Sequence, residues 1–167
     1  MNMGKSFVTD NRKEYDKIIR AFKSLEKIEA TVGLHDDLGV HPGPHNDDKL
    51  TYADIGRIQE FGATVIHPDG EPIDIPSRPF TAHSFDKNKT EIMADIQNVH
   101  RQIMKGQDAI DAIRVLAEKH KARQQAVMKA WTEPPNSPRT VKIKGFNDPL
   151  VHTGAMIEGV DVKINGK

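Results

Sequence analysis

The stretch from residue 55 to residue 80 constrains the fold most, because it encodes a helix, a tight hairpin and a corner in immediate succession. Its first apolar residues recur at helical spacing, at Ile55, Ile58 and Phe61. Gly62 follows where a helix C-terminus favours a residue that tolerates positive φ. Thr51 and Asp54, just upstream, have the spacing of a capping box. The sequence therefore predicts a helix that begins at Thr51 and ends at Gly62.

A β-hairpin is predicted directly after this helix. Residues 63–67 are rich in β-branched side chains, and residues 73–75 alternate apolar and polar character as a returning strand does. Between them, residues 68–72 contain Pro, Asp and Gly, which favour a turn. Pro76 and Pro79 end the second strand, because proline has no N–H to donate to a sheet.

The hairpin has more apolar residues than one face of two strands can bury. These residues are Val65, Ile66, Ile73 and Ile75. We therefore predict that the hairpin is a subunit or partner interface. Arg78 lies in the corner between the two prolines, and we expect its guanidinium to tie the strand end either to backbone carbonyls or to a neighbouring subunit's carboxylate.

The whole chain is predicted to be α+β, with a small, mainly antiparallel sheet and a β-hairpin packed against an N-terminal helix and a long αα-hairpin. Asp10 is the expected N-cap of the first helix, which we expect to cover one face of the sheet. The further elements expected are helices at 11–28, 81–105 and 107–131, a short helix from 149 to 157, and strands at 31–34 and 160–164.

We expect one domain over residues 1–167, with three less regular parts: a flexible arm at 1–10, a mobile loop at 36–49, and an extended, linker-like segment at 133–148. Residues 139–145 alternate charged and β-branched side chains, so they favour either a strand or an extended basic segment. The apolar content of the last two parts is too low to offset their ordering entropy without a partner.

Histidines and aspartates are concentrated in residues 35–48, which contain three His and four Asp. These are suitable metal ligands, but a run containing Pro42 and Pro44 does not supply the turns or helical spacing of a structural site. We therefore expect no metal there. A long loop is more often a binding element, and His41 and His45 are its candidate partner contacts.

Charge is unevenly distributed along a chain whose formal net charge is zero. Residues 1–100 contain 12 Lys and Arg against 17 Asp and Glu, whereas residues 101–145 contain 10 against 4. The basic segment is either a solvated helix surface or a surface for phosphate or an acidic protein. Lys142 and Lys144 are its candidate partner contacts.

Several classes of protein are disfavoured by the sequence. No apolar run approaches the roughly 20 residues of a membrane span, so no membrane partner is expected. Cysteine is absent, and no phosphate-binding glycine loop or common hydrolase motif occurs. Ser77 has no base beside it in the sequence. We expect neither an enzyme nor a cofactor.

Three motifs together resemble a family of tailed-bacteriophage virion-morphogenesis proteins, the tail-completion or neck proteins. The first is the strand at residues 30–34. The second joins Ile-Gly-Arg-Ile-Gln-Glu-Phe-Gly at 55–62 to Ile-Pro-Ser-Arg-Pro-Phe at 75–80. The third is the Pro-Leu-Val-His-Thr-Gly-Ala-Met run at 149–156, where His152 replaces the family's usual Asp and Met156 its usual Leu. The resemblance extends over residues 30 to 160.

This resemblance implies a structural virion protein of the neck, a head–tail connector or tail-completion ring subunit, present in the host cytoplasm during assembly. It implies a homo-oligomeric ring, with six copies favoured and twelve possible. It further implies contacts with adjacent connector, portal-side and tail proteins. Double-stranded DNA would pass through the channel without sequence-specific binding. The alternatives are a tail terminator protein, or a nucleic-acid-binding module that uses the basic residues 101–145.

Overall fold

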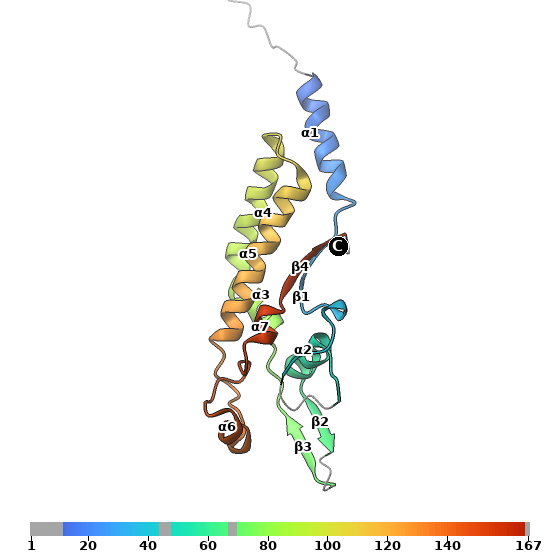
Figure 1. Cartoon of the computed structure of the whole chain (residues 1–167). Coiled ribbons are helices and arrows are strands. Elements are labelled where there is room, and N and C mark those ends of the chain that lie inside the picture. Colours follow the sequence, from blue (N-terminus) through green and yellow to red (C-terminus); the bar gives the residue numbers. More distant parts are fainter. Residues whose placement is uncertain (1–11, 44–47, 67–69, 166–167) are drawn as a thin grey trace, which may run out of the picture.

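The computed structural model describes residues 12–43, 48–66 and 70–165, and within them the chain has the α+β fold that the sequence predicts (Figure 1). The elements in chain order are α1 (Arg12–Leu25), β1 (Ala30–Gly33), the 3₁₀ helix η1 (Asp36–Leu38), α2 (Tyr52–Phe61), β2 (Ala63–Ile66), β3 (Pro72–Ile75), α3 (Phe80–Lys87), α4 (Lys89–Met104), α5 (Ala109–Lys129), α6 (Pro138–Lys144), α7 (Ala155–Glu158) and β4 (Asp161–Ile164).

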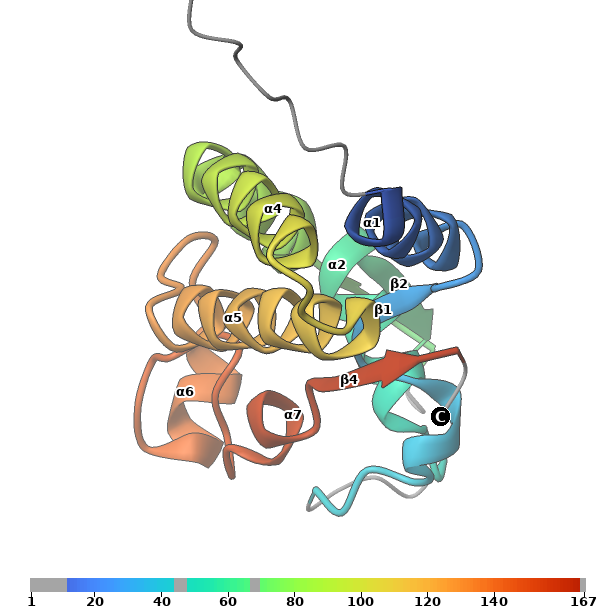
Figure 2. The same ribbon diagram turned by 90° about the horizontal axis from the view of Figure 1, so that it is seen from above.

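Helices α4 and α5 form the predicted αα-hairpin, and together with α1 they make a helical body (Figures 1 and 2). The Asp108 side chain caps α5 by accepting hydrogen bonds from two backbone N–H groups, at 2.8 and 3.2 Å. The buried residues of this body are Val99, Ile103, Ala109 and Ala112, with Phe22 and Leu25 of α1 packed against them. The expectation that α1 covers a sheet is therefore wrong, because its apolar stripe packs on α4 and α5.

The described strands form two separate antiparallel pairs rather than one sheet. β1 pairs with β4, with Val32 opposite Val162, and β2 pairs with β3, with Val65 opposite Ile73. Helix α5 packs on the β1–β4 pair, where Ala117 contacts the buried Val162. This explains why α1 lies elsewhere: two short strands present one narrow apolar face, and α5 already occupies it.

A second buried cluster lies where the C-terminal half of α5 meets α3 and α7. Its members are Phe80, Val127, Met128, Leu150, Met156, Ile157 and Val160. Residues from the second and third motifs of the sequence therefore pack together, since Phe80 ends one and Leu150 belongs to the other. The short helix expected from 149 to 157 is in fact confined to α7, and Gly154 precedes it with a φ of 87°.

The predicted helix at 81–105 is interrupted, and Asn88 separates α3 from α4. The Asn88 backbone leaves the helical region, and its side-chain amide donates to the Ser84 carbonyl at 2.8 Å. Asparagine competes for backbone groups in this way, which favours a break inside a helical pattern. The Phe85 side chain, just before this break, is 48% exposed.

Residues 133–148 are not wholly extended, because they contain α6. Ser137 caps this helix by accepting from the Thr140 N–H at 3.2 Å, Pro138 occupies a first-turn position, and Gly145 ends it with a φ of 82°. Both alternatives for residues 139–145, a strand and an extended basic segment, are wrong here, since these capping residues outweigh the alternation of charged and β-branched residues. The arm at 1–10, with Asp10, and residues 44–47 and 67–69 lie outside the described part.

Candidate interaction surface

The β2–β3 hairpin projects from the end of the molecule opposite α1 (Figure 1). Val65 and Ile73 face each other across the strands and are each 41% exposed, and Ile66 is 68% exposed. Ile75 is partly buried at the base of the hairpin. Alternation places Val65 and Ile73 on one face, while the other face has the Thr64 hydroxyl, which donates to Asp74 at 2.7 Å. Three of the four predicted interface residues are therefore accessible.

The base of the hairpin is fixed by a close backbone approach at Gly62. This residue ends α2 with a φ of 76°, and its N–H donates to the Ile58 carbonyl at 2.9 Å, as the sequence predicts. A Cβ at this position would lie 2.8 Å from the Ile75 carbonyl oxygen. Phe61, which the helical spacing placed on an apolar stripe, is 77% exposed beside this base. It extends the exposed apolar surface and was missed in the sequence.

Arg78 connects the hairpin base to the segment after α5. Its side chain is buried, and its guanidinium donates to the Pro134 and Pro135 carbonyls, each at 3.0 Å, and to Gln59 Oε1 at 2.9 Å. Burial lowers the pKa of Arg78. Of the two roles predicted for this residue, the structure shows binding to backbone carbonyls. We refer to Arg78, Gln59, Pro134 and Pro135 as the arginine clamp.

Glu60 ties the end of α2 to the start of α3, a role the sequence did not suggest. Its carboxylate accepts from the backbone N–H groups of Thr81 at 2.9 Å and Ala82 at 3.2 Å, and its carbonyl accepts from the Ser77 hydroxyl at 2.7 Å. A carboxylate at a helix N-terminus satisfies donors that have no partner within the helix. The hydrogen bond of Ser77 therefore has a structural role, at the corner between β3 and α3.

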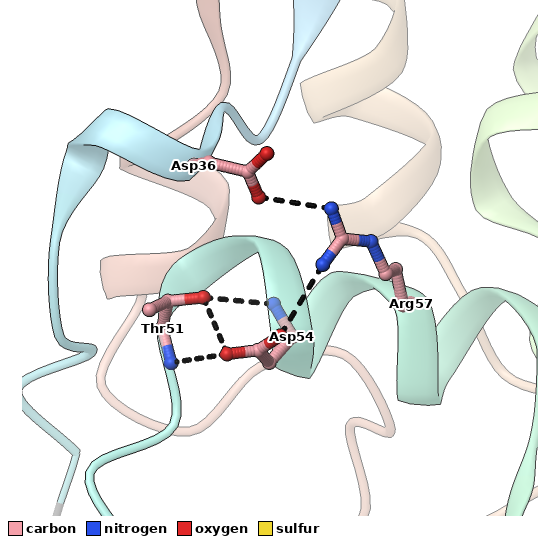
Figure 3. Close-up of polar contacts among 4 residues, drawn as sticks. All are labelled: Asp36, Thr51, Asp54 and Arg57. Carbon is pink, nitrogen blue, oxygen red and sulfur yellow. Dashed lines mark hydrogen bonds and ion pairs between the residues drawn. The ribbon is translucent and has the colours of Figure 1, made fainter.

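The start of α2 has the predicted capping box, which Figure 3 shows with its neighbours. Thr51 Oγ1 accepts from the Asp54 N–H at 3.1 Å, and the Asp54 carboxylate accepts from the Thr51 N–H at 3.0 Å. Arg57 bridges Asp54 at 3.3 Å and Asp36 at 2.9 Å. Hydrogen bonds from Thr51 are the main reason that the pKa of Asp54 is lowered. The first residues of the predicted mobile loop are therefore held against α2.

His41 packs back against the body. Its ring lies edge-on to Tyr52 with centroids 5.0 Å apart, and its Nδ1 accepts from the Gly43 N–H at 2.9 Å. His41 and His152 line a cavity of about 240 Å³, and the pKa of His41 is lowered by burial and then by His152. His45 lies outside the described residues. Among the residues that are described, no three His, Asp or Glu side chains are placed to hold a metal ion.

Basic residues of α5 and α6, in the 101–145 segment, differ in their partners. On α5, Lys119 and Arg123 both bind Asp95, at 2.6 and 2.5 Å. Lys121 of the same helix binds Asp161 at 3.1 Å. On α6, Lys142 is exposed, whereas Lys144 is partly buried, donates to the Asp148 carbonyl at 2.6 Å and lies 5.0 Å from the Phe146 ring centroid.

The two helices also differ in electrostatics. The pKa of Lys144 is lowered, mainly by burial. On α5, Lys119, Lys121 and Arg123 are compensated by carboxylates of the same chain. Arg101, Lys105, Arg114 and Lys129 are also exposed, so the exposed basic charge of this segment extends from α4 and α5 to α6.

Comparison with known proteins identifies no relative: no family model matches the chain, and no curated protein or solved structure is significantly similar. None of the described helices combines the length and the apolar character that a membrane-spanning segment requires.

Proposed function

We propose that this chain is a structural virion protein of a tailed phage, a tail-completion or connector subunit of the ring at the head–tail junction. The proposal is supported by the resemblance of the three motifs and by the exposed apolar hairpin. A tail terminator is a related alternative, because it too is a ring subunit. The role is non-enzymatic and needs no cofactor.

The exposed hairpin is the observation on which the proposal depends. Two strands of four residues are marginally stable by themselves in water, and β2 and β3 pair only with each other among the described strands. Large apolar side chains grouped on such an element are typical of an interaction site. A neighbouring subunit or ring would supply the burial that the chain itself does not provide.

The arginine clamp fixes the orientation of the hairpin base relative to α2 and to the segment after α5. Arg78 stands directly after the second strand, and its three side-chain bonds connect it to α2 and to the segment after α5. In the proposed ring, hexameric or dodecameric, this base would hold the hairpin towards a neighbour while the helical body forms the wall. Portal-side and tail proteins would contact the faces above and below, and DNA would pass through the channel.

Nucleic-acid binding by the basic segment is less well supported. Phosphate binding relies on accessible Lys and Arg. Arg101, Lys105, Arg114 and Lys129 are exposed, but Lys119, Lys121 and Arg123 are paired with carboxylates of the same chain. A mobility shift with duplex DNA that weakens steeply with added salt would support this alternative instead.

The test is complementation of a phage that lacks this gene. Loss of the protein should leave filled heads and finished tails that do not join, and the wild-type chain should restore infectious particles that contain it. Ile66→Asp should fold but fail to restore them. The matched control is Met93→Asp, on α4, since Met93 is also exposed, at 52%. Absence of the protein from purified particles, or full yield with Ile66→Asp, would contradict the proposal.

A further inference from the structure

We infer that the contact between neighbouring copies joins the β2–β3 hairpin of one subunit to α6 of the next. This inference rests on the proposed ring, and it specifies which surfaces meet. The partner is a second copy of this chain, and each copy contributes a different surface on its two sides. We define the α6 surface as Arg139, Lys142, Ile143, Lys144 and Phe146.

Charge complementarity is the first argument for this pairing. The hairpin, residues 63–75, contains three acidic residues and no Lys or Arg. Glu71 and Asp74 are its described acids, and both are exposed. The α6 surface contains three basic residues and no acid. Opposite charges on two surfaces steer their encounter and fix their register, and like charges oppose the pairing of hairpin with hairpin or α6 with α6.

The two surfaces also match in apolar character. Ile143 is 58% exposed and Phe146 is 37% exposed, and the Lys144 ammonium lies over the Phe146 ring. On the hairpin, Val65 and Ile73 share one face and are each 41% exposed. Each side therefore offers apolar side chains bordered by charges, which is the usual composition of a protein interface.

The arrangement of the two surfaces explains why they do not meet within one chain. Both lie at the end of the molecule away from α1 (Figure 1). At that end, the hairpin and α6 are on opposite sides of the molecule, as both views show (Figures 1 and 2). The arginine clamp stands between them, because Arg78 follows the hairpin and Pro134 and Pro135 precede α6. Contacts between two different surfaces are heterologous, and they produce a ring when the rotation closes.

The absence of cysteine allows a direct test by cross-linking. One full-length variant has Ile73→Cys and a second has Ile143→Cys. When the two are mixed and oxidised, disulfide-linked dimers should form about tenfold faster than with Ile73→Cys mixed with Met93→Cys, because docking raises the effective concentration of the two thiols. Linkage of Ile73→Cys to itself should be as slow as in that control.

Charge reversal provides an independent readout that needs no disulfide geometry. Lys142→Glu in the α6 partner, or Glu71→Lys in the hairpin partner, should lower the cross-linking rate towards the control. Mixing the two reversed partners should restore it. All of these side chains are exposed, so the variants should retain the circular dichroism spectrum of the wild type.

The inference is overturned if the hairpin and α6 cysteines link no faster than the control pair, or if hairpin cysteines link fastest to one another. It is also overturned if the double reversal fails to restore linkage. The proposed function is tested separately by the protein's presence in particles. A protein found in the neck whose hairpin and α6 do not cross-link would retain the function and exclude this interface.

Discussion

Ile103 and Ile66 are the same type of side chain in two differently organised regions. Ile103, on α4, is fully buried among residues of α4 and α5, whereas Ile66, on β2, is 68% exposed. The helical body buries a core of Val99, Ile103, Ala109 and Ala112 within the chain, although Met93, Met104 and Val115 remain exposed on it. The end formed by the hairpin and α6 leaves apolar residues such as Ile66 accessible, so this end gains little stability from the monomer itself.

The charged residues differ in the same way. In the body, the Asp95 carboxylate is 14% exposed and accepts from both Lys119 and Arg123. At the projecting end, Lys142 and Glu71 are exposed. The described chain thus combines a helical unit that has its own buried core with a projecting end whose exposed side chains a partner would cover in the proposed ring. The following substitutions test this difference.

The largest effect is expected from truncation of the buried isoleucine. Ile103→Ala removes apolar contacts and leaves a cavity, which should lower the free energy of unfolding by about 2–5 kcal/mol. Ile66→Ala should change it by less than about 0.5 kcal/mol, because an exposed side chain loses little burial. Urea denaturation of both variants measures the difference. Equal losses would mean that the hairpin is part of the cooperative core.

Arg78 is expected to have the next largest effect, because its buried side chain joins the hairpin base to α2 and to the segment after α5. Arg78→Ala leaves the Pro134 and Pro135 carbonyls without their donor and should lower the free energy of unfolding by about 2–3 kcal/mol. Arg78→Lys should recover only part of this loss, since an ammonium lacks the planar set of donors. Arg57→Ala is the control, because its two ion pairs are solvent-exposed and should contribute less than about 1 kcal/mol.

The elements that the sequence predicts well are those specified by a few local residues. The capping box of Thr51 and Asp54, the positive φ at Gly62 and the hairpin with its exposed apolar residues all depend on neighbours within a few positions. The binding of Arg78 to backbone carbonyls was anticipated, but not which carbonyls. Pro134 and Pro135 are more than 50 positions away, and no local pattern specifies that contact.

The errors arose where two local signals competed or where the outcome depended on tertiary packing. In α6, the alternation of Val141 and Ile143 with lysines favoured a strand, although Ser137, Pro138 and Gly145 were sufficient capping signals for a helix. The sequence does not show that β1 pairs with β4 alone. Because this two-stranded pair has one narrow apolar face, which α5 covers, α1 packs on helices instead. The exposed apolar residues of α6 were missed because they were assigned to an extended segment.

A smaller effect is expected from the ion pairs of the body. Hydrogen bonds from Lys119 and Arg123 lower the pKa of Asp95, so the folded state binds this proton less readily than the unfolded state does. The resulting stability is present above the unfolded pKa and is lost as the pH falls through the lowered, folded value. Asp95→Asn should therefore cost about 1 kcal/mol at neutral pH.

The same comparison at low pH tests the cause. The difference between wild type and Asp95→Asn should shrink as the pH falls below about 4, where the unfolded carboxylate begins to protonate. Asp86→Asn, on the exposed surface of α3, is the control and should show no such pH dependence. A constant difference down to pH 2 would show that the ion pairs are not its source.

The smallest effect on global stability is expected from Ser137→Ala, which removes the N-cap of α6 at the projecting end. The corresponding substitution in the helical body, Asp108→Ala, serves as the comparison. Asp108→Ala removes the cap of α5 and should lower the free energy of unfolding by about 1 kcal/mol. Ser137→Ala removes the same kind of bond from α6, yet the urea midpoint should hardly move, because α6 opens without unfolding the body. Hydrogen exchange should instead become faster in residues 138–144 alone.

In assembled particles this acceleration should disappear, since the proposed neighbour covers α6. Unchanged exchange in the free variant, or a midpoint shift equal to that of Asp108→Ala, would show that α6 belongs to the same cooperative unit as the body.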